Sequence, residues 1–340
     1  MSRPAPRPGA AVDLRVPGSA ANIGPGFDSI GVALGVLDRY RAVVTEEPGL
    51  HIDMADAQGA PADERHLVVA TMYRAFEILG VERPAGLHLT CRNTIRMGRG
   101  MGSSAAAIVA GVALADALWR PEACEGAEGE SVPVDLAFVN DLAGALEGHP
   151  DNSSASVFGG VTLSYAEDDV DIREGGRDEA QGGPIPRVHT TRLSLHPDIA
   201  PVLFVPATQL PTSTARAVLP AMVPHGDAAK NSARAALLVH ALTTDPSRLL
   251  AATREWLHQE QRRASYSEAM ALVDALRADG HAAVISGAGP SVLALVEASR
   301  AESVTAPSSW QRALPGIPAV GVTVERATLS SSLGERADAR

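Results

Sequence analysis

The sequence predicts an α+β fold in two domains, and three observations support this prediction. The chain has 340 residues, about twice the usual length of a domain. Segments with the alternating pattern of strands and segments with helical periodicity occur in both halves. An acidic and then Gly/Pro-rich segment lies between them. We therefore expect an N-terminal domain over 1–170, a linker over 166–187, a C-terminal domain over 188–330 and a frayed tail over 331–340.

The first half is expected to be mostly sheet, followed by helices. The helix after His66 carries its apolar residues near one face. It is expected to end at Gly80, because glycine favours helix termination. Strands are expected over 11–16, 40–45, 50–54 and 87–91 and from 158 onward, and helices over 66–79, 103–119 and 133–146. In the second half, strands are expected over 191–195, 201–205, 283–286, 292–296 and 319–324, with three helical stretches between 212 and 279.

Composition excludes several classes of protein. Apolar residues make up 45% of the chain, enough for a packed core, and the net charge of −11 disfavours binding to nucleic acid. Cys91 and Cys124 are too few for a disulfide framework or a zinc cluster, so we expect a reduced, cytoplasmic protein. The longest apolar run, 105–115, is too short to span a membrane. Residues 1–14 lack the apolar stretch of a signal peptide and are expected to form a short disordered leader.

A glycine-dense segment, GRGMGSS over 98–104, leads directly into a predicted helix. Glycines allow positive φ and close backbone approach, and the free N–H groups of a helix start attract anions, so the segment suits a phosphate. It matches neither the P-loop nor the dinucleotide-binding pattern. The alternative is an ordinary strand-to-helix turn capped by serine. Three arginines precede this helix, at positions 92, 96 and 99. They would either create a local positive field at the glycine segment or lie on a solvent-exposed strand edge.

Three further segments carry groups suited to binding. Glu147-Gly-His-Pro-Asp-Asn152 follows a predicted helix, and its carboxylates suit Mg²⁺; a capped helix end is the alternative. A Gly-Pro-Gly turn carries Asn22 and Asp28, and it would hold a small polar ligand or only reverse the chain. The glycine loop 286–291 lies between two apolar strands and is either a binding loop or a plain turn. Motifs of serine hydrolases and zinc proteases do not occur.

The four segments, in this order, resemble the GHMP family of small-molecule kinases. The matching stretches are SAANIGPGFDSIGVALG at 19–35, GRGMGSSAAAIVAG at 98–111, LEGHPDN at 146–152 and SGAGPSVLAL at 286–295. Within this family, RAVLPAMVP at 216–224, NSARAALLV at 231–239 and ATREWLHQ at 252–259 resemble the homoserine kinase branch. The resemblance covers nearly the whole chain except the leader, the linker and the tail.

The resemblance implies an N-terminal domain like ribosomal protein S5, a ferredoxin-like C-terminal domain and a homodimer. It implies Mg²⁺-dependent transfer of a phosphoryl group from ATP to the hydroxyl of L-homoserine, a reaction of threonine biosynthesis. The matching nucleotide positions are His66, Gly98, Arg99, Gly100, Met101, Gly102, Ser103 and Ser104, with Mg²⁺ near Ser104 and Glu147. The matching substrate positions are Asn22, Asp28, His149, Thr212, Arg216, Arg262 and Gly287, and the candidate catalytic residues are Asn152, Asp151, Glu147 and Arg216.

Residue chemistry agrees with these assignments, although some positions depart from the family pattern. Asp28 can bind an ammonium group, and Arg216 and Arg262 can hold a carboxylate. We hypothesise that Asn152 orients the acceptor hydroxyl without a strong side-chain base. The departures are Glu260, Gln261 and Tyr266 near Arg262, Ala229-Lys230 before Asn231, and Gly18-Ser19-Ala20. They leave open a sibling kinase for another hydroxylated acceptor and a non-catalytic regulator that binds ATP or an amino acid.

Overall fold

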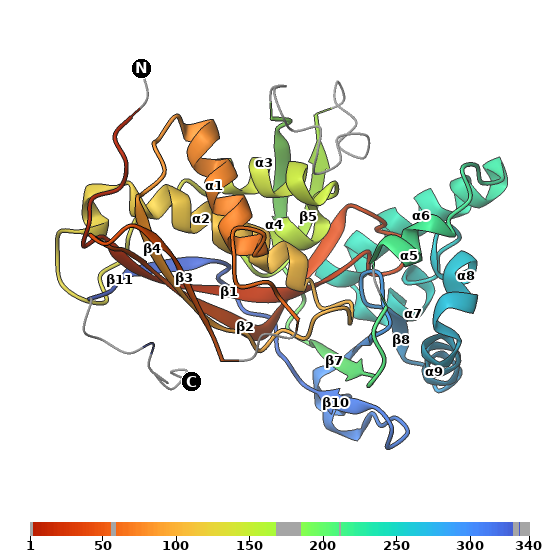
Figure 1. The fold of residues 1–340 in the computed structure, drawn as a ribbon. Coiled ribbons are helices and arrows are strands. Elements are labelled where there is room, and N and C mark those ends of the chain that lie inside the picture. The colour runs from red at the N-terminus through yellow and green to blue at the C-terminus, as the bar shows by residue number, and fades with distance from the viewer. Residues whose placement is uncertain (1–2, 56–58, 168–184, 211, 329–332, 334–340) are drawn as a thin grey trace.

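The computed structural model describes residues 3–55, 59–167, 185–210, 212–328 and 333, without the side chains of residues 212 and 213. Two sheets, each with helices on it, lie side by side (Figure 1). The larger has seven strands in the order β11-β1-β2-β4-β3, and β5 pairs with both β2 and β6. The smaller has four strands in the order β10-β7-β9-β8. The predicted α+β, two-domain fold class is therefore confirmed.

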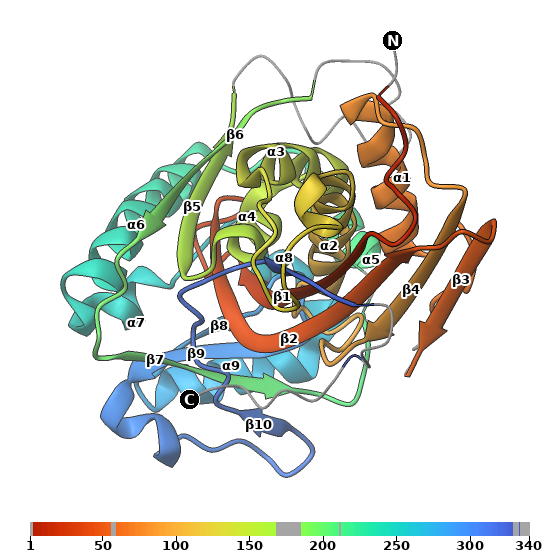
Figure 2. The same ribbon diagram turned by 90° about the vertical axis from the view of Figure 1, so that its left-hand side faces the viewer.

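The larger sheet contains β1 (Ala11–Ala21), β2 (Ile30–Val44), β3 (Gly49–Met54), β4 (Gly86–Arg92), β5 (Val161–Ala166), β6 (Val188–Leu193) and β11 (Thr323–Arg326). Helices α1 (Leu67–Leu79), α2 (Ser103–Leu118), α3 (Leu136–Glu147) and α4 (Pro150–Phe158) cover one face of it (Figure 2). Helix α2 carries apolar side chains around its whole circumference, and nearly all of its residues are buried. At Gly111, a Cβ atom would lie 2.0 Å from Oγ1 of Thr71, so the missing side chain lets α1 and α2 pack closely.

The smaller sheet contains β7 (Ile199–Val205), β8 (Ala282–Ile285), β9 (Val292–Glu297) and β10 (Gln311–Ala313). The helices of this part of the chain are α5 (Thr212–Ala217), α6 (His225–Thr243), α7 (Leu249–Ala252), α8 (Gln259–Arg262) and α9 (Ser267–Ala278). The buried apolar face of α9 packs on β8 and β9 and forms a second core. None of the described helices is long and apolar enough to cross a membrane.

Pairing between strands divides the chain differently from the expected boundary. β6 pairs with β5 and β11 pairs with β1, so both strands belong to the larger sheet although they lie within 188–330. The sheet therefore takes strands from both sides of the expected linker, of which residues 168–184 lie outside the described part. Most of the expected tail, 331–340, also lies outside it. Sequence patterns detect strands but not which sheet each strand joins, because pairing depends on contacts distant in sequence.

Two other expectations differ from the structure. The expected disordered leader is ordered from Arg3, whose backbone bridges to Gly80 and Glu82 and whose guanidinium lies over the ring of Trp119. Helix α4 was expected to be a polar turn followed by a strand. Its Ser-rich sequence lacks apolar periodicity, but Pro150 occupies the first helical turn, where proline is favoured, and the helix is buried against α2, α3 and β1.

Candidate active site

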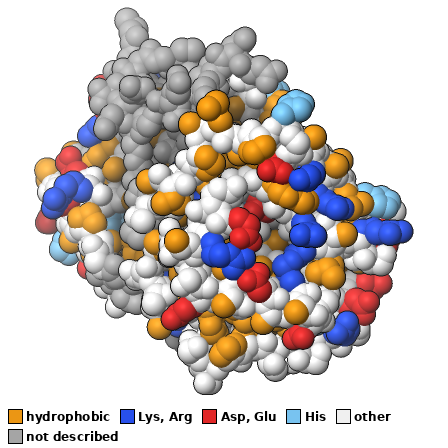
Figure 3. Space-filling view, turned by 90° about the vertical axis from the view of Figure 1, so that its right-hand side faces the viewer, with side chains coloured by type: hydrophobic (Ala, Val, Ile, Leu, Met, Phe, Trp, Pro, Cys, Tyr) orange, Lys and Arg blue, Asp and Glu red, His pale blue; other side chains and the backbone are white. Residues whose placement is uncertain are grey.

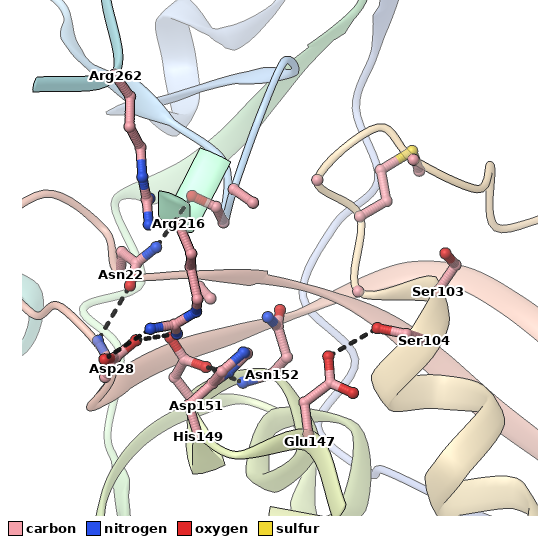
Figure 4. Close-up of a pocket in the computed structure, with 17 residues that line it drawn as sticks. Asn22, Asp28, Ser103, Ser104, Glu147, His149, Asp151, Asn152, Arg216 and Arg262 are labelled. Atoms are coloured by element: carbon pink, nitrogen blue, oxygen red, sulfur yellow. Dashed lines mark hydrogen bonds and ion pairs between the residues drawn. The ribbon is translucent and has the colours of Figure 1, made fainter. Parts of the chain in front are cut away.

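The four predicted segments meet in one cavity between the two sheets (Figure 4). Its walls come from the turn after β1, the loop before α2, the junction of α3 and α4, helices α5 and α8, and the β8–β9 loop. Of the residues predicted from sequence, it brings together Asn22, Asp28, Gly98, Gly100, Met101, Gly102, Ser103, Ser104, Glu147, His149, Asp151, Asn152, Arg216, Arg262 and Gly287. Ala21 and Ala288 also line the cavity, and no polar side chain marks them in the sequence.

The glycine loop before α2 adopts the backbone that its composition predicts. Gly98, Gly100 and Gly102 have φ values of 65°, 69° and 68°, a left-handed region that favours glycine. A Cβ atom on Gly100 would lie 2.2 Å from the carbonyl oxygen of Ser286, whose hydroxyl donates a 2.6 Å hydrogen bond to the Gly100 carbonyl. The β8–β9 loop of the second sheet thus closes over the glycine loop of the first.

Helix α2 begins without a serine cap, contrary to the alternative considered above. Gly102 occupies the N-cap position, while Ser103 and Ser104 are the first two helical residues. Gly102 has no side chain that could accept a hydrogen bond from the first helical N–H groups. These groups and the positive end of the helix therefore remain directed at the cavity, as an anion site requires.

Ser104 and Glu147 form the candidate metal site. Ser104 Oγ donates a 2.7 Å hydrogen bond to Oε1 of Glu147, the last residue of α3. The other carboxylate oxygen, Oε2, is buried and has no hydrogen-bond partner among the described residues. A buried carboxylate oxygen without a partner is costly in an apolar environment but is satisfied by a divalent cation. The two side chains therefore fit Mg²⁺ beside the phosphates of a nucleotide.

Asp28 and Arg216 meet at the opposite end of the cavity. Nη2 of Arg216 lies 2.6 Å from Oδ1 of Asp28 and Nη1 lies 3.4 Å from Oδ2. Asp28 and Asn22 have positive φ values of 57° and 71°, which few residue types adopt and which mark strained functional turns. Asn22 holds this turn, because its Oδ1 accepts from the Asp28 N–H and its Nδ2 donates to the Gly287 carbonyl.

Arg262, the last residue of α8, supplies a second guanidinium group to the lining of the cavity. Its side chain is 1% exposed, and its Nε donates a 2.8 Å hydrogen bond to the Ala215 carbonyl. Nη1 is buried and has no hydrogen-bond partner within the described part of the chain. Burial lowers the pKa of Arg262, since the charged form loses hydration. An anion bound in the cavity would supply the missing partner.

His149, Asp151 and Asn152 stand at the start of α4, between the two ends of the cavity. Asp151 Oδ1 lies 2.9 Å from His149 Nδ1 and accepts a 2.8 Å hydrogen bond from the Asn152 N–H. Burial opposes protonation of His149, but the charge and hydrogen bond of Asp151 outweigh it and raise the pKa of His149. Ser19 Oγ donates to Asn152 Oδ1 at 3.0 Å, which fixes the amide. The Nδ2 group of Asn152 is thereby oriented as a donor.

His66 lies in a second cavity of about 380 Å³, which adjoins the first and shares Gly98, Ser103 and Ser104 with it. It is the N-cap residue of α1, and burial lowers its pKa. The second cavity is lined mainly by apolar atoms and by Tyr40 and Asn93. Its position next to the anion loop suits the base and sugar of a nucleotide whose phosphates lie on the loop.

Among the described residues, Arg99 is a predicted site residue that does not line the cavity. The guanidinium of Arg99 donates to the carbonyls of Pro206 (2.9 Å) and Ala207 (2.6 Å), so it fastens the glycine loop to the end of β7 rather than facing a phosphate. The side chain of Thr212 lies outside the described part of the structure. Sequence reasoning missed Ser19 as the partner of Asn152. Its signals in the sequence were its place in the first motif and its departure, with Gly18 and Ala20, from the family pattern.

Most departures from the family pattern point away from the cavity. Glu260 pairs with Arg263, Lys230 pairs with Asp227, and Gln261 donates to the Trp256 carbonyl. The face of α5 to α9 drawn in Figure 3 carries interspersed acidic and basic side chains. Two departures lie beside the cavity. Tyr266 is buried, and its ring would lie 3.1 Å from a Cβ atom on Gly289. Ser19 is buried and donates a hydrogen bond to Asn152, which lines the cavity. The substitutions at Glu260, Gln261 and Lys230 therefore leave the lining of the cavity unchanged.

Comparisons with known proteins agree with this arrangement. Two family models match the sequence, GHMP kinases N terminal domain over 66–160 and GHMP kinases C terminal over 236–307. A homoserine kinase of Streptomyces coelicolor is 44% identical over 328 residues, 95% of this chain and 97% of the relative. A solved homoserine kinase of Cytophaga hutchinsonii has a TM-score of 0.74 at 21% identity, covering 93% and 97%. A mevalonate diphosphate decarboxylase of Staphylococcus aureus has a TM-score of 0.60 at 15% identity, covering 93% and 98%.

The anion loop, the candidate metal pair and these relatives define a small-molecule kinase. A decarboxylase shares the fold, so the fold alone does not specify the reaction. The chain belongs to the GHMP kinase family, and it resembles the homoserine kinases within that family.

Proposed function

We propose that the protein transfers the γ-phosphoryl group of ATP to the side-chain hydroxyl of L-homoserine, giving O-phospho-L-homoserine and ADP. The observation that carries this proposal is the acceptor end of the cavity, where the buried carboxylate of Asp28 lies near two guanidinium groups, those of Arg216 and Arg262, while the neighbouring carboxylate of Asp151 is paired with His149. An α-amino acid presents the complementary pair of charges. The homoserine kinase of Streptomyces coelicolor, 44% identical over nearly the whole chain, supports L-homoserine as the amino acid that is phosphorylated.

In this proposal, Asp28 binds the ammonium group of the acceptor and the two arginines bind its carboxylate. Arg262 offers the buried Nη1 group that lacks a partner in the described structure, and Arg216 offers the fork that now contacts Asp28. Fixing both ends of the amino acid leaves its side-chain hydroxyl directed toward Asn152 and the phosphate loop. Positioning of this kind converts two separate molecules into neighbouring reactants and lowers the barrier accordingly.

The nucleotide would extend from the cavity of His66 to the glycine loop. The N–H groups at the start of α2 would bind its phosphates, and Ser104 and Glu147 would hold Mg²⁺. Bound Mg²⁺ supplies positive charge that neutralises the transferring phosphoryl group. Asn152 Nδ2 orients the acceptor hydroxyl, and the helix start stabilises the negative charge of the transition state. Arg216 contributes to catalysis by positioning the acceptor through its carboxylate. Asp151 acts by holding His149 and the Asn152 backbone.

Two alternatives from the sequence are less well supported. A sibling kinase for another acceptor rested on departures at Glu260, Gln261, Tyr266, Ala229-Lys230 and Gly18-Ser19-Ala20. The side chains of Glu260, Gln261 and Lys230 make contacts outside the cavity. Ser19 and Tyr266 lie beside it, so these two positions still support this alternative. A non-catalytic regulator would have no need for the aligned Ser104, Glu147 and Asn152. A homodimer stays a proposal based on the resemblance, and light scattering of the purified protein tests it. A reducing, cytoplasmic location stays a proposal based on the low number of cysteines, two in 340 residues.

The decisive experiment is a coupled ADP-release assay at saturating Mg·ATP with a matched set of acceptors. L-Homoserine is compared with 4-hydroxybutanoate, which lacks the ammonium group, with 3-aminopropanol, which lacks the carboxylate, and with L-serine, whose side chain is one methylene shorter. We expect L-homoserine to give the highest kcat/KM and mass spectrometry to detect its phosphate ester. Higher kcat/KM with L-serine or with a truncated acceptor would refute homoserine as the substrate, and no acceptor-dependent ADP release would refute a kinase.

A further inference from the structure

A group of metal-ligating side chains lies on the larger sheet, among residues that line neither of the two cavities. His51 and Asp53 are two residues apart on β3, so they project from the same face of this edge strand. β3 pairs in parallel with β4, and His88 of β4 is the register partner of His51. The opposite face of β3 carries Leu50, Ile52 and Met54, which pack on the core. The three polar side chains thus share the open face of the sheet, at the end far from α5 to α9 (Figure 1).

The distances among these side chains fit a single ion. One ligand atom from each of the three residues lies within 4.8 Å of the others. Nε2 of His88 lies 2.8 Å from Oδ2 of Asp53, and Nε2 of His51 lies 3.9 Å from Oδ1. A tetrahedral ion with bonds of about 2.0–2.1 Å holds its ligand atoms about 3.3 Å apart, between the two observed separations. Small rotations of exposed side chains would therefore complete the geometry.

The donor set indicates which ion would bind. Two imidazole nitrogens and one carboxylate oxygen favour Zn²⁺ and its first-row neighbours, whereas Mg²⁺ prefers oxygen ligands. The alternative to a metal site is a simple surface ion pair between His88 and Asp53. Such a pair involves only two of the three residues and would contribute little to stability. A metal site requires a further ligand, and His51 supplies it: it lies two residues before Asp53 on β3, with its Nε2 3.9 Å from the same carboxylate.

We propose that His51, Asp53 and His88 bind one Zn²⁺-type divalent cation and thereby fasten the edge strand β3 to β4. The site is distinct from the Mg²⁺ position at Ser104 and Glu147, because it shares no residue with either cavity. Three protein ligands leave one coordination position to water or to a further donor. The proposal does not depend on the identity of the phosphoryl acceptor.

Calorimetric titration of the metal-free, full-length protein with Zn²⁺, in the presence of excess Mg²⁺, tests the site. We expect one Zn²⁺ per chain, and at least a tenfold weaker Kd in His51→Ala and in His88→Ala, since changing even an indirect partner of a metal ligand costs about tenfold or more. His189→Ala is the matched control, because His189 is also an exposed strand histidine paired with a carboxylate, Glu167, at 3.0 Å. Binding of equal affinity in His88→Ala and the wild type would overturn the proposal.

A second group, Asp28, His149 and Asp151, also has ligand atoms within 4.8 Å of one another, so Zn²⁺ bound there must be distinguished. If the Kd weakens in His149→Gln but not in His88→Ala, the ion binds in the cavity and the proposal fails. Thermal unfolding gives an independent readout: Zn²⁺ should raise the Tm of the wild type and leave the Tm of His88→Ala unchanged. Kinase activity in Mg·ATP without Zn²⁺ should be equal in both proteins, so a failure of the proposed reaction does not affect this result.

Discussion

Asp28 and Arg216, which are 188 residues apart in the chain, form an ion pair across the cavity with Nη2 and Oδ1 2.6 Å apart. They are the two groups to which we assign the ammonium and the carboxylate of the acceptor. We expect this pair to separate when an amino acid binds, because each charged group of the amino acid then replaces one partner.

Removing the charge of Asp28 should weaken acceptor binding selectively. Asparagine tolerates the φ of 57° at this position, so Asp28→Asn changes the charge and keeps the backbone. Losing one partner of a desolvated charge pair costs at least about 2 kcal/mol, so we expect the KM for L-homoserine to rise about 30-fold or more while the KM for ATP stays the same. Asp227→Asn, which breaks the exposed pair with Lys230, is the control. An acceptor KM within twofold of the wild type in Asp28→Asn would contradict the assignment.

Asn152→Ala should lower kcat with little change in either KM. The amide is held by Ser19 and oriented toward the reacting hydroxyl, and removing one such oriented donor typically costs about 100-fold in kcat. Ser19→Ala should have a smaller effect in the same direction, because the amide remains but rotates more freely. Ser232→Ala, whose hydroxyl bonds only to its own helix, serves as the control. Normal turnover in Asn152→Ala would show that Asn152 does not orient the hydroxyl.

Gly100→Ala should disrupt the phosphate loop. A methyl group there would lie 2.2 Å from the Ser286 carbonyl oxygen, and the φ of 69° is unfavourable for alanine. We expect a lower Tm and loss of ATP binding, measured by thermal unfolding and by calorimetry. Gly226→Ala, in the first turn of α6, meets nothing within 4 Å and should leave the Tm unchanged or raise it. The reverse ranking of the two variants would contradict the loop geometry.

The His149–Asp151 pair should make stability depend on pH. Because the pKa of folded His149 is raised, its contribution to stability is complete below the ordinary histidine pKa of about 6.5 and is lost as the pH rises through the folded value. The Tm difference between wild type and His149→Gln should therefore shrink as the pH rises above about 6.5. NMR titration of the imidazole measures the pKa directly. A difference that widens with pH, or a pKa below 6.5, would contradict this prediction.

Glu147→Gln should raise the Mg²⁺ concentration needed for activity. The neutral amide keeps the hydrogen bond to Ser104 but replaces the buried Oε2, which has no partner in the described structure, with an uncharged group. We expect a higher half-saturating Mg²⁺ concentration in the ADP-release assay and an unchanged KM for L-homoserine. Glu260→Gln, which alters an exposed pair with Arg263, is the control. An unchanged half-saturating Mg²⁺ concentration would show that Glu147 is not a ligand of the cation.

Much of the site was predictable because its parts are local. The glycines at 98, 100 and 102 identify a loop of positive φ whatever they pack against, and the helix after Ser103 is apolar on every side. Helix α4 was not predictable in this way. Its residues lack helical periodicity, and burial among α2, α3 and β1 stabilises it instead.

The sequence by itself therefore determined the fold class and the positive-φ glycine loop before α2, and it identified Glu147 as a candidate ligand, because each follows from short-range backbone preference or from residue chemistry. Only the tertiary structure decided that Arg99 binds backbone carbonyls instead of a phosphate and that β6 and β11 join the larger sheet. The ion pair between Arg216 and Asp28 likewise follows only from the tertiary structure. Contacts between residues far apart in sequence arise from the packing of whole sheets and helices, which no local pattern encodes.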